Sequence, residues 1–183
     1  MRLTLASQSP RRARILSDLG VEFDVVKTDA PEVSRPNDPE GTVVANARAK
    51  LLACGRAPAL AADTIVWFAG KIYGKPRDLA EAKAFLRELS GQTHTVFTGV
   101  AYRGPSLHNG LAPILTACAR SDVTFRELSD ADIDEYVARV RPTDRAGAYD
   151  IDESGDLIVA SYTGEYENIM GLPVEPLRRF GII

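Results

Sequence analysis

Two arginines stand at the start of an expected helix, in the segment Ser7-Gln8-Ser9-Pro10-Arg11-Arg12. Ser9 is a favourable N-cap, and proline is favourable at the first helical position. A helix N-terminus carries partial positive charge and free N–H groups, so acidic residues are favoured in its first turn. An anion bound to both arginines and to the free amides would reverse the cost of placing them there. The segment therefore suggests a phosphate site, with two solvated surface arginines as the alternative. The GxxxxGK[ST] pattern of P-loop enzymes is absent.

Asp63 interrupts an apolar run, in Leu60-Ala61-Ala62-Asp63-Thr64-Ile65-Val66-Trp67. An isolated carboxylate inside an apolar strand is costly unless it is paired. We therefore expect Asp63 at the end of a strand, beside a cation or a metal ion. A structural aspartate that caps a neighbouring turn is the alternative. The apolar residues on both sides favour the functional interpretation.

Three further charged residues are candidates for the same site: Glu32, Lys50 and Lys75. Each alone would ordinarily be a solvated surface charge. Together with the two arginines and Asp63, they would suit a polyphosphate and a divalent metal ion, because cations bind phosphate oxygens and carboxylates bind the metal. This hypothesis requires a fold that brings them together.

The elements that must position these residues alternate between strands and helices. Apolar patterning predicts strands over residues 3–6, 23–26, 59–68, 71–73, 93–103, 115–126 and 157–160. Helices are expected over 10–19, 42–54, 78–89, from 129 onward with a capping box, and over 173–180. The segment 28–41 reads as a polar loop. This mixture predicts an α/β fold with a mixed sheet.

Composition excludes several classes of protein. The chain has 183 residues, 45% of them hydrophobic and 26% charged, which indicates one globular domain rather than a disordered chain. The net charge of -3 disfavours nucleic-acid binding through phosphate contacts. Cys54 and Cys118 are too far apart for a zinc ribbon and too few for a disulfide scaffold.

The chain also shows no pattern typical of secretion or membrane insertion. Arginines interrupt the N-terminal segment, and the best apolar run, 60–70, is broken by Asp63. We therefore expect a soluble intracellular protein with no membrane partner. His94 and His108 lack partners at metal-ligand spacing and are expected to be structural.

Residues 5–12, LASQSPRR, resemble the signature of the Maf family of nucleotide pyrophosphatases. The resemblance continues in family order through ADT at 62–64, GKP at 74–76, LSGQTHTVFTG at 89–99, RAGAY at 145–149 and NIMGLP at 168–173. These blocks cover nearly the whole chain, so a chance match is excluded in practice.

The resemblance implies a fold shared with the inosine-triphosphate pyrophosphatases: one α/β domain over 1–183, with a long mixed central sheet and two lobes around a deep cleft. It implies a cytoplasmic enzyme, often a homodimer, that converts a nucleoside triphosphate to the monophosphate and pyrophosphate with Mg²⁺ or Mn²⁺. Carried over by position, Asp63 would accept the proton of the attacking water and, with Glu32, help to hold the metal. Residues that would hold the triphosphate are Ser7, Arg11, Arg12, Lys50 and Lys75.

Substrate choice depends on a few positions. The residues at positions 11 and 64, Arg11 and Thr64, are similar to those of the dTTP/UTP branch. The 7-methyl-GTP branch has tryptophan at the position of Arg11. The departure is Tyr149-Asp150-Ile151-Asp152, where the dTTP/UTP branch typically reads Tyr-Gly-Ile-Gln. Asp152 thus replaces a base-reading glutamine with a shorter side chain that, when ionised, only accepts hydrogen bonds. We expect dTTP and UTP as substrates, with Asp152 in the substrate site.

Two alternatives stay open. One is a pyrophosphatase for 7-methyl-GTP or another modified nucleotide, which the carboxylate of Asp152 would favour. The other is a nucleotide-binding regulator of cell division and septum formation. The complete set of charged residues favours catalysis, because a pure sensor has no need of Asp63.

Overall fold

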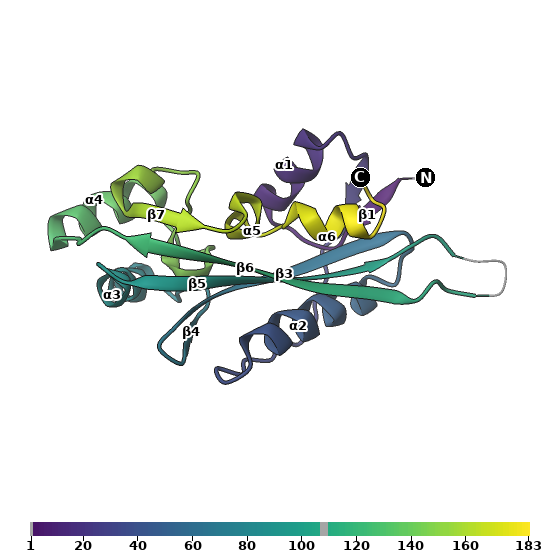
Figure 1. Ribbon diagram of the computed structural model, residues 1–183, viewed down its shortest axis with the longest axis horizontal. Helices are drawn as coiled ribbons and strands as arrows, with labels where there is room; N and C mark the ends of the chain where they lie inside the picture. Colours follow the sequence, from purple (N-terminus) through teal and green to yellow (C-terminus); the bar gives the residue numbers. More distant parts are fainter. Residues whose placement is uncertain (1, 107–109) are drawn as a thin grey trace.

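The computed structural model describes residues 2–106 and 110–183, so the prediction for His108 lies outside the described residues. Its centre is a mixed sheet of the order β2-β1-β3-β5-β6-β7, with β4 paired to β3 (Figure 1). The β1–β2 and β1–β3 pairs are parallel and the others antiparallel. The strands are β1 Leu3–Leu5, β2 Phe23–Val25, β3 Ala59–Phe68, β4 Lys71–Tyr73, β5 Thr93–Arg103, β6 Ile114–Phe125 and β7 Val159–Thr163. The predicted α/β class with a long mixed sheet is confirmed.

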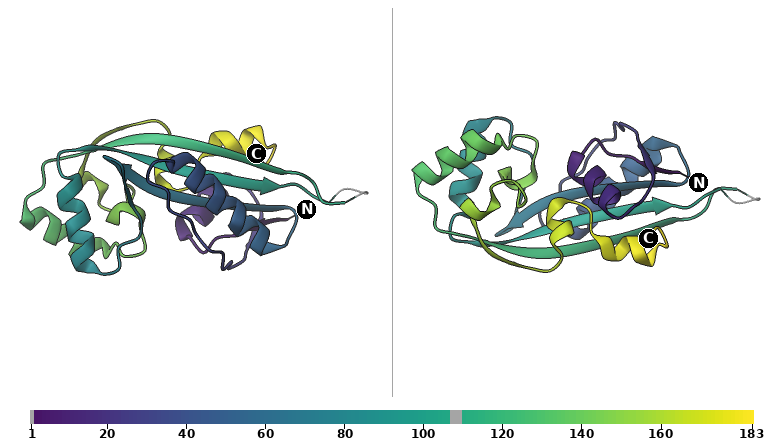
Figure 2. Two further views of the ribbon diagram at one scale, coloured as in Figure 1. Left: turned by 90° about the horizontal axis from the view of Figure 1, so that it is seen from below. Right: turned by 90° about the horizontal axis from the view of Figure 1, so that it is seen from above.

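Helices cover both faces of this sheet. They are α1 Pro10–Asp18, α2 Pro39–Cys54, α3 Leu79–Leu89, α4 Asp130–Val140, α5 Tyr166–Met170 and α6 Val174–Arg179, with short 3-10 turns at Ala146–Ala148 and Gly155–Leu157. In Figure 1, α2 lies on one face, and α1, α5 and α6 lie on the other. Figure 2 shows α3 and α4 gathered at one end of the sheet, apart from the helices around its other half. This arrangement gives the molecule the two lobes that the family resemblance implies.

The pairing of β3 leaves a gap in the sheet between these lobes. Strand β5 pairs along one edge of β3, from Ala59 to Trp67. On the other edge, β1 pairs only with Ala59 and Leu60, and the pairing with β4 starts at Val66. Within the described ranges, no strand covers this edge of β3 at residues 61–65. Side chains from both faces of the strand can therefore reach the same opening, because successive side chains of a strand point to opposite faces.

Two elements differ from the sequence prediction by more than one residue, and one helix was not predicted. Helix α2 begins at Pro39 rather than at residue 42, because Asp38 caps it by accepting from the Gly41 N–H at 2.9 Å. Proline is compatible with a first helical turn, so Pro39 starts the helix instead of belonging to the loop. Strand β7 lies two to three residues later than predicted, since residues 155–157 form a 3-10 turn. The short helix α5 was not predicted.

The core has two main apolar clusters, one in each lobe. Residues of β5, β6, α3 and α4 form the first, around the fully buried Tyr136 and Phe125. Residues of β1, β3, α1 and α6 form the second, around Leu5, Leu16 and Leu60. These clusters fix the strands and helices that flank the gap in the sheet.

His94 is buried in the first cluster, as its expected structural role requires. Its Nε2 lies 2.9 Å from the Tyr149 hydroxyl, and its ring packs edge-on against Phe125 and Tyr149. Its Nδ1 has no hydrogen-bond partner among the described residues. Burial lowers the pKa of His94 to about 4, because the cationic form would lose its hydration.

This pKa predicts a loss of stability in acid. Below the ordinary histidine pKa of about 6.5, the side chain binds a proton in the unfolded chain but stays neutral in the folded chain. The free energy of unfolding therefore falls as the pH drops toward 4. The complete loss corresponds to about 3 kcal/mol. Unfolding by urea at several pH values should show the wild type losing stability relative to His94→Gln over this window. A difference between the two proteins that does not change with pH would contradict the prediction.

Candidate active site

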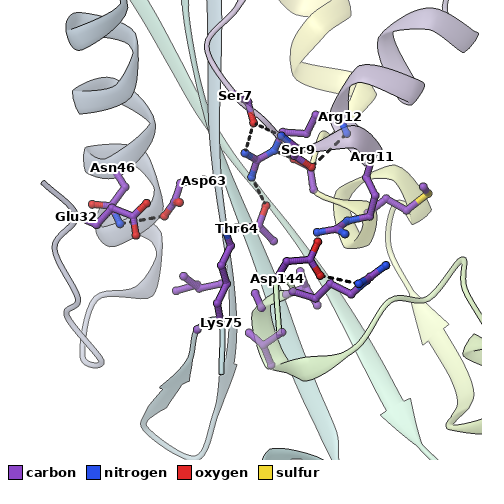
Figure 3. Close-up of a pocket in the computed structure, with 18 of the residues that line it drawn as sticks. Ser7, Ser9, Arg11, Arg12, Glu32, Asn46, Asp63, Thr64, Lys75 and Asp144 are labelled. Atoms are coloured by element: carbon purple, nitrogen blue, oxygen red, sulfur yellow. Dashed lines mark hydrogen bonds and ion pairs between the residues drawn. The ribbon is translucent and has the colours of Figure 1, made fainter. Parts of the chain in front are cut away.

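A cleft of about 780 Å³ opens at the gap in the sheet. Figure 3 shows that α2 and the preceding loop form one wall, β3 the floor, and the start of α1 the opposite wall. Nine charged side chains line it: Arg11, Arg12, Glu32, Lys50, Asp63, Lys75, Asp144, Arg145 and Asp150. The fold therefore brings together six of the charged residues selected from the sequence.

Asp63 occupies the middle of β3, which corrects the expectation that it would lie at the end of a strand. The residue is buried at 6% exposure. Its Oδ1 accepts from Lys50 Nζ at 2.6 Å, and its Oδ2 accepts from Asn46 Nδ2 at 2.9 Å. One cation and one amide therefore compensate the buried charge, so a position inside the strand is tolerated. The expected neighbouring cation is present, and the turn-capping alternative is wrong.

Gly99 allows α2 to approach Asp63. It lies directly opposite Asp63 on β5, so both face α2. A Cβ at Gly99 would stand 2.4 Å from the backbone carbon and oxygen of Val43 in α2, far inside van der Waals contact. Asn46 and Lys50 follow Val43 on the helix, four residues apart and therefore on one face. The absence of a side chain at position 99 is what lets both reach the carboxylate.

Glu32 joins this group from the loop before α2. Its Oε1 lies 2.7 Å from Lys50 Nζ, so one lysine bridges Glu32 and Asp63. No group of three or more metal-binding side chains occurs in residues 2–106 and 110–183. Mg²⁺ commonly takes one or two carboxylates and completes its shell with phosphate oxygens and water. The pair of carboxylates fits that kind of site, although it could not form a metal cage without a bound polyphosphate.

Arg12 lies half-buried against the opposite side of β3. Its guanidinium donates to the hydroxyl of Ser7 at 3.0 Å, to that of Thr64 at 3.1 Å and to the carbonyl of Gly171 at 2.8 Å. Burial lowers the pKa of Arg12 to about 10, which leaves it cationic at neutral pH. Ser9 caps α1 as predicted, since its hydroxyl accepts from the backbone of Arg12. Arg12 therefore supplies a fixed positive charge at the helix N-terminus.

Arg11 lies beside a second cluster of charges. Its Nη1 is 3.5 Å from Asp150 Oδ2, and Arg145 Nε donates to the same oxygen at 3.1 Å. Arg145 also pairs with Asp144 and Glu153, at 2.6 Å each. The buried carboxylate of Asp150 thus holds two arginines that line the cleft.

Lys75 and Asp152 differ in their placement. Lys75 follows β4, is exposed on the cleft wall, and pairs with no carboxylate of residues 2–106 and 110–183. Asp152 is not among the cleft-lining residues. Its carboxylate pairs with Arg14 of α1 and accepts from the Tyr166 hydroxyl at 3.1 Å. The substrate-binding role of Asp152 stays a prediction.

Asn46, Arg145 and Asp150 are parts of the site that sequence reasoning did not select. Arg145 belongs to one of the recognised blocks, which could have identified it. Asp150 lies in an acidic run, 150–156, that reads as an ordinary loop. Asn46 looks like a polar surface residue of a helix, and its spacing of four from Lys50 was the one available indication.

Comparison with known proteins agrees with this geometry. The family described as "Maf-like protein" matches residues 2–180. A "dTTP/UTP pyrophosphatase" of Anaeromyxobacter dehalogenans strain 2CP-C is 43% identical, over 98% of this chain and 94% of its own length. Proteins of the same name from Akkermansia muciniphila and Escherichia coli O157:H7 are 40% and 42% identical. These alignments cover 96% and 94% of this chain and 92% and 87% of the relatives.

The packing over Gly99 leads to a testable prediction. Gly99→Ala should destabilise the protein by at least about 2 kcal/mol, because the added methyl group displaces backbone atoms of α2. Gly74→Ala is the matched control, since a Cβ there would meet nothing within 4 Å. Denaturant unfolding of both variants tests the prediction. Equal stability of the two variants would contradict the close approach of α2.

Proposed function

Because the chain belongs to the Maf family, we propose that it hydrolyses nucleoside triphosphates, dTTP and UTP first, to the monophosphate and pyrophosphate. The observation that carries this proposal is the buried, paired carboxylate of Asp63 at the floor of a cleft that also holds five cationic side chains. The cations can bind the phosphates, and the carboxylate can accept a proton. The names of the relatives support the choice of bases.

Asp63 would act as the general base. Water must lose a proton as it attacks the α-phosphorus, and a positioned carboxylate commonly contributes a factor of about 10² to 10⁴ in rate. The side chain is already oriented, since one oxygen is bound by Lys50 and the other by Asn46. The attacking water would be held beside this carboxylate, and its proton would pass to it as the new bond to phosphorus forms.

The cationic residues would bind the triphosphate and stabilise the charge of the departing pyrophosphate. Arg12 is fixed by Ser7 and Thr64, so it offers its charge without reorganisation. Lys75 is exposed on the cleft wall and can reach a phosphate. Lys50 bridges two carboxylates in this structure and could instead contact a phosphate oxygen.

Glu32 and Asp63 would hold the divalent metal, Mg²⁺ or Mn²⁺, which we include in the proposal. When bound, the metal would neutralise phosphate charge as a Lewis acid. Lys50, which bridges the two carboxylates in this structure, would turn toward the phosphates when the cleft is occupied.

The base subsite is the less constrained part of the proposal. Both oxygens of Asp152 are engaged, by Arg14 and by the Tyr166 hydroxyl. An acceptor held in this way cannot replace the donor of a glutamine amide. The carboxylate at position 152, in place of a glutamine, is what favours a second candidate, a pyrophosphatase for 7-methyl-GTP or another modified nucleotide.

The setting of the enzyme is also part of the proposal. We propose a cytoplasmic homodimer with a nucleotide substrate and no nucleic-acid partner, in a role that removes unwanted nucleotides. The net charge of -3 agrees with the absence of a nucleic-acid partner. None of the helices in the described ranges combines the length and apolar character needed to cross a membrane.

A substrate panel tests this proposal. Purified protein with Mg²⁺ would be given dTTP, UTP, CTP, dGTP, ITP and 7-methyl-GTP in ¹⁸O-labelled water, with pyrophosphate and phosphate assayed separately. We expect pyrophosphate from dTTP and UTP, with the label in the monophosphate, because water attacks the α-phosphorus. A parallel Mn²⁺ series tests the choice of metal.

The other outcomes of the panel assign the protein differently. Preference for 7-methyl-GTP would make Asp152 the dominant specificity residue and select the second candidate. Label in pyrophosphate would contradict attack at the α-phosphorus. Tight nucleotide binding without any turnover would replace the enzyme with a regulatory nucleotide-binding protein, such as one acting in septum formation.

A further inference from the structure

Asn46 links the carboxylate of Asp63 to the loop that carries Glu32 through a single buried side chain. It lies on α2 and is 3% exposed. Its Oδ1 accepts from the backbone N–H of Val33 at 2.8 Å, and its Nδ2 donates to the carbonyl of Val33 at 3.0 Å. The same Nδ2 donates to Asp63 Oδ2 at 2.9 Å. Asn46 therefore connects β3 to the loop residue next to Glu32.

These contacts fix the orientation of the amide. A carboxamide offers two N–H donors and one acceptor oxygen, and Asn46 uses all of them on two neighbours. Rotating the amide by half a turn would place its oxygen against both the Val33 carbonyl and the Asp63 carboxylate. Both of these groups accept hydrogen bonds, so an amide oxygen facing them would be repelled. The N–H donors of Asn46 must therefore face Asp63.

The two oxygens of Asp63 are therefore not equivalent. Oδ2 is bound by a neutral, buried amide, whereas Oδ1 faces Lys50, a long side chain that also contacts the half-exposed Glu32. Lys50 can move from Asp63 to a phosphate because its side chain is long. Asn46 cannot move away from Asp63 without breaking its hydrogen bonds with Val33. The departure of Lys50 would therefore free Oδ1 and leave Oδ2 bound to Asn46.

We propose that Asn46 is a positioning residue, which holds Asp63 by Oδ2 so that Oδ1 faces the attacking water. This inference rests on the proposed function. The competing explanation is that Asn46 only anchors the loop. Thr42 provides the comparison, because its hydroxyl accepts from Arg35 and donates to the Asp38 carbonyl in the same loop without touching Asp63.

The test compares Asn46→Leu with Thr42→Val, since both remove loop contacts and only the first releases Asp63. We expect Asn46→Leu to lower kcat by about 10- to 100-fold, the usual effect of losing a residue that orients a functional group. The Kd for a non-hydrolysable dTTP analogue should stay within about threefold, since no phosphate contact is lost. Thr42→Val should lower kcat much less. Asn46→Ser, which keeps a small donor, should fall between them and serves if Asn46→Leu does not fold.

Each outcome decides the inference. A kcat for Asn46→Leu equal to that of Thr42→Val would overturn it and leave loop anchoring as the explanation. A loss confined to nucleotide affinity would overturn it as well. The wild type is assayed first: if it releases no pyrophosphate from any nucleotide, the proposed function fails and the inference falls with it. An active wild type with an unaffected Asn46→Leu overturns the inference alone.

Discussion

The buried charge of Asp63 is the constraint that organises the site. A carboxylate within a β-strand needs a cation and a hydrogen-bond donor, and the only nearby element that supplies both in the described structure is α2. The helix can reach the strand because Gly99 presents no side chain to it. Packing, charge compensation and chemistry thus depend on one close approach between a helix and a sheet.

The gap in the sheet explains why this charge is also accessible. Strand β1 ends and β4 begins on the same edge of β3, which leaves the segment around Asp63 and Thr64 uncovered. Asp63 points to α2 and Thr64 to Arg12 of α1. Residues that lie on opposite faces of an ordinary sheet therefore meet in one cleft, as Figure 3 shows. The two halves of the proposed chemistry, proton transfer and phosphate binding, are supplied from opposite faces.

Much of this organisation could be predicted from the sequence. Apolar patterning predicted β3, β5 and most helices, and the Ser9-Pro10 pair predicted the start of α1. Asp63 was identified because burying a carboxylate among apolar residues costs free energy unless the charge is paired. Its position in the middle of β3 was missed, since local patterning does not show that β1 and β4 leave that segment open. Asn46 was missed for the same kind of reason: its burial depends on Gly99, in a distant strand.

Proton transfer to Asp63 is the central step of the proposed chemistry, and comparing Asp63→Asn with Asp38→Asn tests it directly. Both changes remove one charge with little change of shape, and asparagine caps a helix about as well as aspartate, so Asp38→Asn should keep its activity. Single-turnover release of pyrophosphate and equilibrium nucleotide binding would be measured on both. We predict that Asp63→Asn loses at least about 100-fold in rate while it still binds nucleotide. A rate equal to that of Asp38→Asn would contradict the account.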